Sequence, residues 1–216
     1  MAIKLYSFFR SSAAYRVRIA LNLKAVEYDI VPVRFAAREH KLAEFLQLNP
    51  QGLLPVLDDN GTVLSQSLAI IEYLDARFGE PQLLPGEPVA RARVAALAQI
   101  IACEIHPLNN LRVLHYLRFE LELDELAVQR WYRHWVAESF AAFEALVAEH
   151  SAGQYCFGDT VTLADVCLVP QVYNARRFDC DLDAYPLLAG IAARLDQQAA
   201  FRRAAPENQP DAPISQ

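Results

Sequence analysis

Two adjacent hydroxyl side chains, Ser11 and Ser12, lie near the start of the chain, where a predicted strand is followed by a predicted helix. The first backbone N–H groups of a helix have no partner within the helix, and with the helix dipole they favour a bound anion. A serine hydroxyl at that point adds a hydrogen-bond donor for the same anion. Serine is also a common helix N-cap, so an ordinary capping role is the alternative interpretation.

The neighbouring residues predict the elements that position these serines. Residues 3–8 show the alternating pattern of a half-buried strand, and the helix continues to residue 21. Arg10 directly precedes the serines, so we expect its guanidinium to project into the same helix mouth. Arginine is well suited to gripping carboxylates, although a solvated surface charge is the alternative for this residue.

A second polar pair, Gln66 and Ser67, stands at the start of a later predicted helix over residues 65–78. An amide and a hydroxyl in front of a helix N-terminus are suited to binding a carboxylate. Pro55 lies earlier, inside a predicted strand over residues 53–57. Proline there indicates either an edge strand or a cis peptide bond with the preceding Leu54.

The first part of the chain alternates between strands and helices. Further strands are predicted over residues 27–33 and 62–64, and a short helix over 42–48. Asn60-Gly61 is a strong hairpin signal, and Gly79 is placed to cap the helix that ends at residue 78. The resulting order, βαβαββα, predicts a thioredoxin-like α/β domain over residues 1–80.

The remainder of the chain is predicted to be helical. Residues 81–88 form a proline-rich linker, and an all-α domain is expected over residues 89–216. A long helix is predicted over 126–149, and Thr162 to Asp165 has capping-box form, which predicts a buried helix over 165–174. The proline-rich tail after Ala204 is expected to be loosely packed.

Bulk composition limits the classes of function. The 216 residues are 54% apolar and 21% charged, as in an ordinary compact protein, and the net charge of −6 argues against a general nucleic-acid binder. No apolar run is long enough for a membrane span and no signal-peptide layout is present, so a cytoplasmic location is expected. The four cysteines form no Cys-x-x-Cys pair and have apolar neighbours, which predicts reduced, buried thiols. The five histidines show no metal-binding spacing, so no metal site is expected.

The string over residues 10–21, Arg-Ser-Ser-Ala-Ala-Tyr-Arg-Val-Arg-Ile-Ala-Leu, closely resembles the signature of zeta-class glutathione transferases, the family that includes maleylacetoacetate isomerase. The resemblance continues to about residue 210 through these segments: His106–Asn110, Phe157–Thr160, Leu163–Asp165, Leu168–Val172, Ala175–Phe178 and Tyr185-Pro186. The best-known form of the family has a cysteine directly after the two serines, whereas this chain has Ala13. The fold implied by the resemblance is the glutathione transferase fold, with a thioredoxin-like α/β domain followed by an all-α domain.

The resemblance implies roles for the polar residues in the first domain. Ser11 and Ser12 would bind and activate the thiol of glutathione, and a cis Leu54–Pro55 bond would present backbone groups to its cysteinyl unit. Gln66 and Ser67 would hold the γ-glutamyl end, and Gln51 would lie near the glycyl arm.

In the second domain, the resemblance implies that Arg177 or Arg176 would bind a dicarboxylate substrate together with Arg10. His106 and Asn110 would contact glutathione or the substrate. A packed or surface role is the alternative for His106, and a surface charge is the alternative for each arginine.

The implied chemistry is glutathione-dependent cis–trans isomerisation. Thiolate addition to a conjugated cis-enone makes the double bond single, rotation follows, and thiolate loss returns the trans product. The enzyme must hold glutathione as the thiolate, stabilise charge on the enolate oxygen and grip the carboxylates of the substrate.

Several functions remain open at this level. Maleylacetoacetate, from phenylalanine and tyrosine breakdown, is the first expected substrate, and maleylpyruvate, from gentisate breakdown, is the alternative. A glutathione transferase acting on haloacids is a third enzyme hypothesis. A non-catalytic scaffold is the hypothesis from another class, although such proteins usually lose the activating hydroxyl or the γ-glutamyl site. The family also leads us to expect a homodimer.

Overall fold

The computed structural model describes residues 3–151 and 153–213. The chain forms two compact units. The first contains the residues up to Gln82 together with those from Gln197 onward, and the second is Leu83–Asp196. The glutathione transferase fold expected from the sequence is confirmed by this α/β unit and a helical unit.

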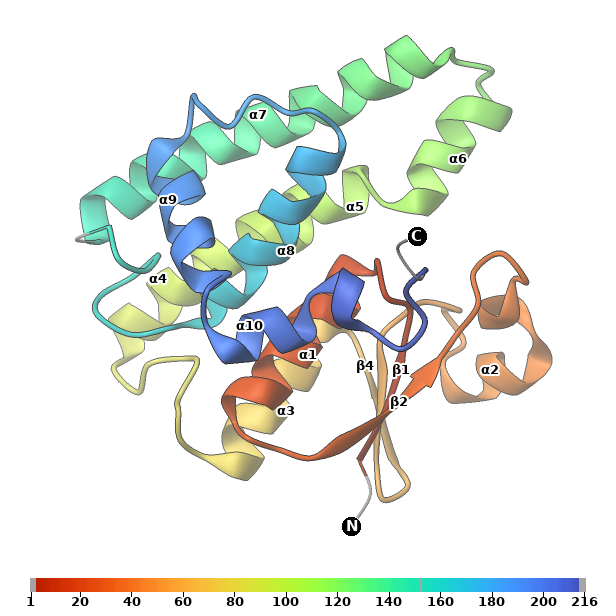
Figure 1. Cartoon of the computed structure of the whole chain (residues 1–216), viewed down its shortest axis with the longest axis horizontal. Helices are drawn as coiled ribbons and strands as arrows, with labels where there is room; N and C mark the ends of the chain where they lie inside the picture. The colour runs from red at the N-terminus through yellow and green to blue at the C-terminus, as the bar shows by residue number, and fades with distance from the viewer. Residues whose placement is uncertain (1–2, 152, 214–216) are drawn as a thin grey trace. The chain divides into compact units, whose positions relative to one another are not determined.

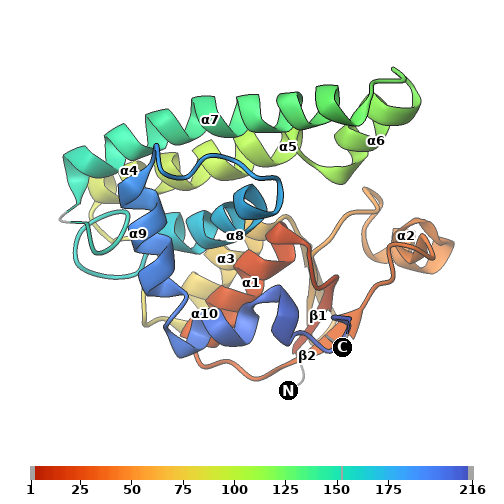
Figure 2. The ribbon, with the colours of Figure 1, turned by 45° about the horizontal axis from the view of Figure 1, so that its top comes forward.

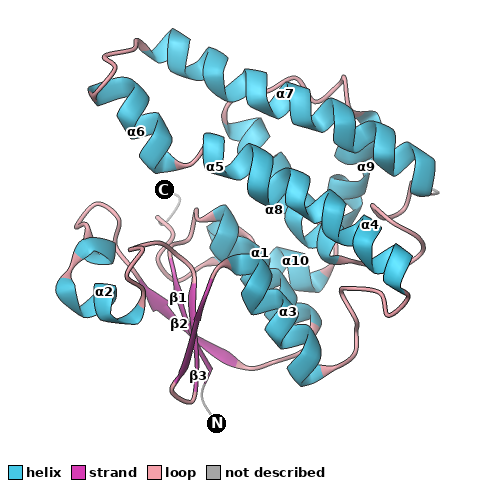
Figure 3. Cartoon of the chain, turned by 180° about the vertical axis from the view of Figure 1, so that it is seen from behind, coloured by secondary structure: helices cyan, strands magenta, loops and turns pink. Residues whose placement is uncertain are grey.

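The first unit is built on one mixed sheet, drawn in magenta in Figure 3. Its strands are β1 (Ile3–Ser7), β2 (Tyr28–Pro32), β3 (Val56–Asp59) and β4 (Thr62–Ser65), in the order β2-β1-β3-β4. β1 pairs in parallel with β2, whereas β3 is antiparallel to both of its neighbours. Leu5 of β1 faces Leu57 of β3 in the ladder, and both side chains are fully buried.

Helices cover both faces of this sheet. They are α1 (Ser12–Leu23), α2 (Ala43–Leu48), α3 (Ser67–Phe78) and α10 (Ala199–Ala204), with short 3₁₀ turns at Glu39–Lys41 and Pro206–Asn208. α1 packs against α3 and also against α10 (Figure 1). The strand, helix and hairpin order predicted for a thioredoxin-like domain is therefore confirmed.

The β3–β4 hairpin follows its sequence signal, but β3 begins later than predicted. Asn60 and Gly61 both have positive φ, 53° and 91°, as a two-residue hairpin turn requires. The strand starts at Val56 instead of residue 53, because Pro55 has no N–H to donate to a ladder. The Leu54–Pro55 peptide bond is cis, and β3 lies between two other strands, so the edge-strand alternative is wrong.

The second unit consists of helices. They are α4 (Pro88–Gln99), a π-helical stretch (Ile100–Ile105), α5 (His106–Leu108), α6 (Leu111–Phe119), α7 (Glu125–His150), α8 (Leu163–Arg177) and α9 (Pro186–Leu195). α8 is the buried centre, packed against α4 and α9 (Figure 2). The capping box predicted at its start is present, with Asp165 Oδ2 accepting from the Thr162 N–H at 2.8 Å. None of the helices in the described part of the chain has both the length and the apolar character of a membrane span.

The C-terminal tail differs from the expectation that it is loosely packed and belongs with residues 89–216. Within that tail, Ala205 and Gln209 are almost fully buried, at 8% and 7% exposed, and Phe201 of the preceding α10 is fully buried. Gln209 Nε2 donates to the carbonyl oxygens of Arg203 and Ala205 at 2.9 and 2.8 Å. The tail packs because its apolar residues cover α1 within the first unit, a long-range contact that no local pattern predicts.

The cysteines follow their prediction only in part. All are free thiols, and Cys156 and Cys167 are buried, but Cys180 is half-buried and Cys103 is exposed. Cys103 lies on the outward face of the π-helical stretch, because Ile101 and Ile105 occupy its buried face. Burial raises the pKa of the Cys180 thiol to about 11, so it is protonated near neutral pH.

Candidate active site

The N-terminus of α1 presents the two predicted serines side by side. Ser11 is the N-cap in extended backbone conformation, and its Oγ accepts from the Ala14 N–H at 3.2 Å. The hydroxyl of a capping serine keeps its own O–H for a second partner. Ser12 is the first helical residue and is 6% exposed. The capping interpretation of Ser11 is thus confirmed, and capping leaves its hydroxyl able to donate to a bound anion.

Arg10 lies in the loop between β1 and α1, next to these serines. Its guanidinium carbon is 5.0 Å from the centroid of the Phe9 ring and 5.8 Å from that of Phe8, within cation–π range. The aromatic wall continues through Phe35, whose ring lies 5.1 Å from Phe8. Arg10 therefore brings an exposed positive charge to the start of α1, as its position in the sequence predicts.

The second predicted polar cluster is assembled around the start of α3. Gln66 Nε2 donates to Gln51 Oε1 at 2.8 Å, so these two amides lie together. Gln66 has a φ of 70°, an uncommon left-handed value for a residue with a side chain, of the kind that collects at functional sites. Ser67 follows as the first residue of α3 and is 6% exposed.

Two arginines of α1, Arg16 and Arg18, support this region and were missed as functional residues in the sequence. Arg16 is 1% exposed, and its Nη1 donates to Ser67 Oγ at 3.3 Å. Arg18 is fully buried and donates through Nη2 to the Phe9 carbonyl oxygen at 3.0 Å. Burial lowers the pKa of Arg18 to about 10, which leaves it charged near neutral pH. The available signal was two arginines within a helix that is otherwise almost entirely apolar from residue 13 to 21.

The N-termini of α1 and α3 each carry the partial positive charge of a helix dipole. α1 and α3 pack against each other, and neither has an acidic side chain in its first turn. The Arg16–Ser67 hydrogen bond joins the interior of one helix to the first residue of the other. The described side chains around Ser11, Ser12, Gln66 and Ser67 therefore suit a small ligand that carries negative charge.

The predicted residues of the second unit form two separate groups within it. Asn110 Nδ2 lies 3.4 Å from His106 Nε2, and Asn110 Oδ1 caps α6 by accepting from the Arg112 N–H at 3.1 Å. At the end of α8, Arg176 pairs with Asp196 at 3.2 Å, whereas Arg177 Nη1 donates to Asn174 Oδ1 at 3.2 Å. Their joint use with Arg10 and the serines stays a prediction.

The sequence and the structure were compared with those of known proteins. Residues 1–76 match the family model for the glutathione S-transferase N-terminal domain. Over 214 residues the chain is 52% identical to a probable maleylacetoacetate isomerase of Vibrio cholerae, with 98% of this chain and 99% of that protein covered. The chain belongs to the zeta-class glutathione transferase family.

Solved structures of zeta-class relatives agree with this assignment. One, described as the holo structure of maleyl pyruvate isomerase, a bacterial zeta-class glutathione S-transferase, has a TM-score of 0.95 and 50% identity, and the match covers 97% of this chain and 100% of that one. A maleylacetoacetate isomerase from Methylobacterium extorquens AM1, solved with bound malonate and glutathione, has a TM-score of 0.92 and 38% identity, and the match covers 98% and 100%.

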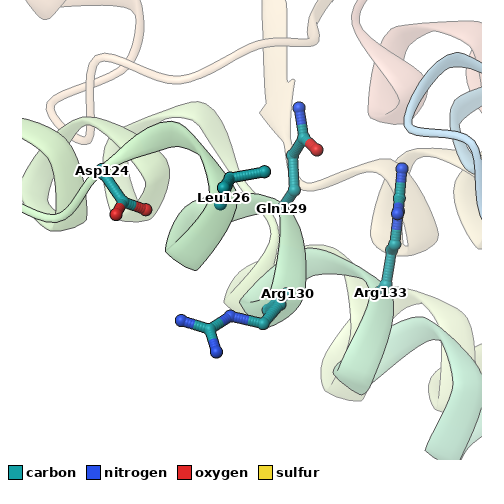
Figure 4. A pocket seen from close by; sticks show the side chains of 5 residues that line it. All are labelled: Asp124, Leu126, Gln129, Arg130 and Arg133. Atoms are coloured by element: carbon teal, nitrogen blue, oxygen red, sulfur yellow. The ribbon is translucent and has the colours of Figure 1, made fainter.

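A cavity elsewhere in the second unit is lined by none of the predicted site residues. It lies at the first turns of α7 and is lined by Asp124, Leu126, Gln129, Arg130 and Arg133 (Figure 4). Arg130 points away from Gln129 and Arg133 in Figure 4, and Arg133 Nε is engaged by the Phe178 carbonyl oxygen at 3.0 Å. These side chains do not converge on a common point. In the described ranges, no group of three or more His, Cys, Asp or Glu residues is arranged to hold a metal ion.

Proposed function

We propose that this zeta-class protein is a glutathione-dependent cis–trans isomerase that converts maleylacetoacetate to fumarylacetoacetate. The observation that carries the proposal is the presence of two polar helix N-termini on two helices that pack against each other in one unit, one with Ser11 and Ser12 and the other with Gln66 and Ser67. The 52% identity to a probable maleylacetoacetate isomerase supports the same assignment.

The residues present fit glutathione. Gln66 and Ser67, with the α3 N-terminus behind them, offer donors for the γ-glutamyl carboxylate, and the Gln51 amide next to Gln66 suits the glycyl arm. The backbone of Leu54, beside the cis Pro55, is assigned to the cysteinyl unit. When bound, glutathione supplies the thiolate that adds to the conjugated double bond and later leaves.

Ser11 and Ser12 are assigned to thiolate formation. A free thiol has a pKa near 8.5, and hydroxyl donors at a helix N-terminus lower such a value by roughly one unit or more. Ser11 is our first choice, because its Oγ sits at the N-cap and its O–H is oriented by the Ala14 N–H donated to it. Ser12 supports the same charge from the first turn.

The dicarboxylate substrate is assigned to arginine. Arg10 is exposed beside the serines, and guanidinium groups bind carboxylates through paired hydrogen bonds. In α8, Arg177 is preferred over Arg176, because Arg176 already forms an ion pair with Asp196. His106 and Asn110, held 3.4 Å apart, are assigned to contacts with glutathione or substrate.

A second substrate, maleylpyruvate, is supported by a specific comparison. The structure with the TM-score of 0.95 is described as a maleyl pyruvate isomerase, and both substrates are cis-enone acids that need the same thiolate. A haloacid transferase would use this same thiolate site. A non-catalytic scaffold is disfavoured because both serines and the Gln66-Ser67 pair are present.

The first experiment measures isomerisation of maleylacetoacetate and maleylpyruvate side by side, with and without glutathione. We expect glutathione-dependent turnover, faster with one of the two acids. Ser11→Ala and Ser12→Ala should lower kcat, one of them by about a hundredfold, since a lost charge-stabilising donor costs on that order. Ser139→Ala, on α7, is the matched control. Unchanged rates in both active-site variants would refute the assignment of the thiolate site.

A homodimer in the cytoplasm belongs to the same proposal. The family supports the dimer, and a reducing compartment suits four unpaired thiols. Light scattering should give twice the 24.3 kDa mass of the chain. A monomer at micromolar concentration would contradict this part of the proposal.

A further inference from the structure

The loop that carries the thiolate site is held by the far end of the chain. The backbone N–H of Phe9 donates to Asp211 Oδ2 at 2.9 Å, across 202 positions of sequence. The carbonyl oxygen of Phe9 accepts from Arg18 Nη2 at 3.0 Å. Both polar groups of the Phe9 backbone are therefore fixed by side chains from outside the loop, two residues before Ser11.

Arg18 joins the loop to the tail as well as to the sheet. Its Nε donates to the Ala204 carbonyl oxygen at 2.9 Å, and its Nη1 donates to Ser7 Oγ at 3.0 Å. Burial disfavours the charge of Arg18, and the nearby Asp211 carboxylate partly offsets that effect. A buried, charged donor with three acceptors in different segments fixes those segments relative to one another.

The conformation of the tail places Asp211 next to the Phe9 loop. Residues 204–211, here called the C-terminal strap, turn back along α1 toward the end of β1 (Figure 1). Gln209 is 7% exposed and donates to two carbonyl oxygens of the preceding turn, which fixes the strap's own conformation. Pro206 is also buried.

We propose that the C-terminal strap is a positioning element for the thiolate site, with Asp211 and Arg18 as its positioning residues. By holding Phe9 at both backbone groups, they keep the Arg10–Ser11 segment in the conformation that turns the Ser11 hydroxyl into the α1 N-terminus. The inference rests on the proposed function for its catalytic consequence. The structural part of the inference, that the strap keeps this loop ordered, does not depend on the protein's activity.

Three variants test the strap. Asp211→Ala removes the acceptor, Asp211→Asn keeps an oxygen acceptor without the charge, and Glu207→Ala removes an exposed acidic residue of the same strap. We expect Asp211→Ala to raise the KM for glutathione about tenfold, a loss typical of a hydrogen bond to a charged group. Asp211→Asn should recover most of that loss, and Glu207→Ala should match the wild type.

A second measurement reports the loop without reference to turnover. Amide hydrogen exchange over residues 8–12 should be faster in Asp211→Ala than in Glu207→Ala. If Asp211→Ala does not fold, Gln209→Ala loosens the strap without touching the loop and should show the same two changes to a smaller degree. Equal exchange and equal KM in the folded variants would overturn the proposal. A wild type that neither binds nor uses glutathione, yet shows the exchange difference, would refute the proposed function and leave the strap supported.

Discussion

At the scale of single residues, Arg16 and Arg18 have different tasks because of helix geometry. Two positions along an α-helix turn a side chain by about 200°, so neighbours in a pattern such as Arg-Val-Arg face nearly opposite ways. Arg16 reaches Ser67 at the start of α3, whereas Arg18 reaches the end of β1 and the strap. The Arg-Val-Arg segment of α1 thus contacts both parts of the proposed glutathione site, the start of α3 through Arg16 and the loop before Ser11 through Arg18.

The Arg16–Ser67 contact gives a prediction for binding. Arg16→Met keeps a long side chain but removes the donor, so the Ser67 hydroxyl is no longer oriented. We expect about a tenfold rise in the KM for glutathione, since hydrogen bonds to charged groups contribute on the order of 1.5–3 kcal/mol. Stability should fall as well, because removing one partner of a buried polar contact leaves the other partner without it.

Steady-state kinetics at varied glutathione checks this expectation. Arg202→Met is the matched control, because that arginine is exposed on α10 in the same unit. A KM equal to that of the control would show that Ser67 needs no partner in α1.

Ala13 gives a second prediction at this scale. It stands where the best-known form of the family has cysteine, and it is 9% exposed. Because the nucleophile belongs to glutathione, Ala13→Cys should change kcat by less than about threefold, well under 1 kcal/mol of barrier. A gain in turnover of tenfold or more would contradict this and give the missing thiol a catalytic role.

The candidate site was predictable where its signals are local. Ser11, Gln66 and Ser67 are polar residues at predicted helix starts, and this position made them candidates from the sequence alone. A cis peptide bond was one of the two interpretations of Pro55. The supporting arginines were not predictable in the same way. Their acceptors lie 51 and 186 positions away, so a charge that the sequence alone places at the surface is in fact buried.

At the scale of elements, prediction succeeded for segments whose ends carry their own signals. α3 ends before Gly79, as predicted, although it begins at Ser67, two residues later than predicted, and the Asn60-Gly61 hairpin forms. α6 was missed: its cap, Asn110, lies in the segment interpreted as a family motif, and the helix is only nine residues long. Local signals therefore fix boundaries better than they reveal short, exposed helices.

Asp59 joins two elements and gives a prediction of pH dependence. It lies at the end of β3 and binds Tyr73 and Arg77 of α3, at 2.6 and 2.7 Å. The hydrogen bond from Tyr73, helped by Asn60 and Arg77, lowers the pKa of Asp59. A lowered native pKa means that the stabilisation is present above the ordinary carboxyl pKa and is lost as pH falls through the native value.

Asp59→Asn tests this linkage. At pH 7 the variant should be less stable by about 1–3 kcal/mol, the usual cost of disrupting a buried charged hydrogen bond. The difference should shrink as the pH falls below the ordinary carboxyl pKa of about 3.9 and through the lowered native pKa of Asp59. Denaturant unfolding at several pH values measures it, with Asp58→Asn as the neighbouring control. A deficit that does not vary with pH would show that Asp59 acts through packing alone.

At the scale of the whole molecule, the first unit is discontinuous in sequence. The domain prediction ended it near residue 80, but residues from Gln197 onward belong to it. A prediction from sequence assigns a C-terminal tail to the domain that precedes it, because no local pattern shows that the tail packs against an earlier domain. Closing such a unit with a distant segment costs chain entropy, which the buried side chains of α10 must offset.

Phe201 tests whether α10 is an integral part of that unit. It is fully buried on a helix that packs against α1. Phe201→Ala should destabilise the protein by about 3–5 kcal/mol, as for other large-to-small changes in cores. Leu42→Ala, at a leucine that is 54% exposed, should cost little. Hydrogen exchange then locates the damage: α1 and β1 should lose protection, while α8 keeps it. Loss confined to α8 and α9 would mean that the tail serves the helical unit, and the discontinuous first unit would be wrong.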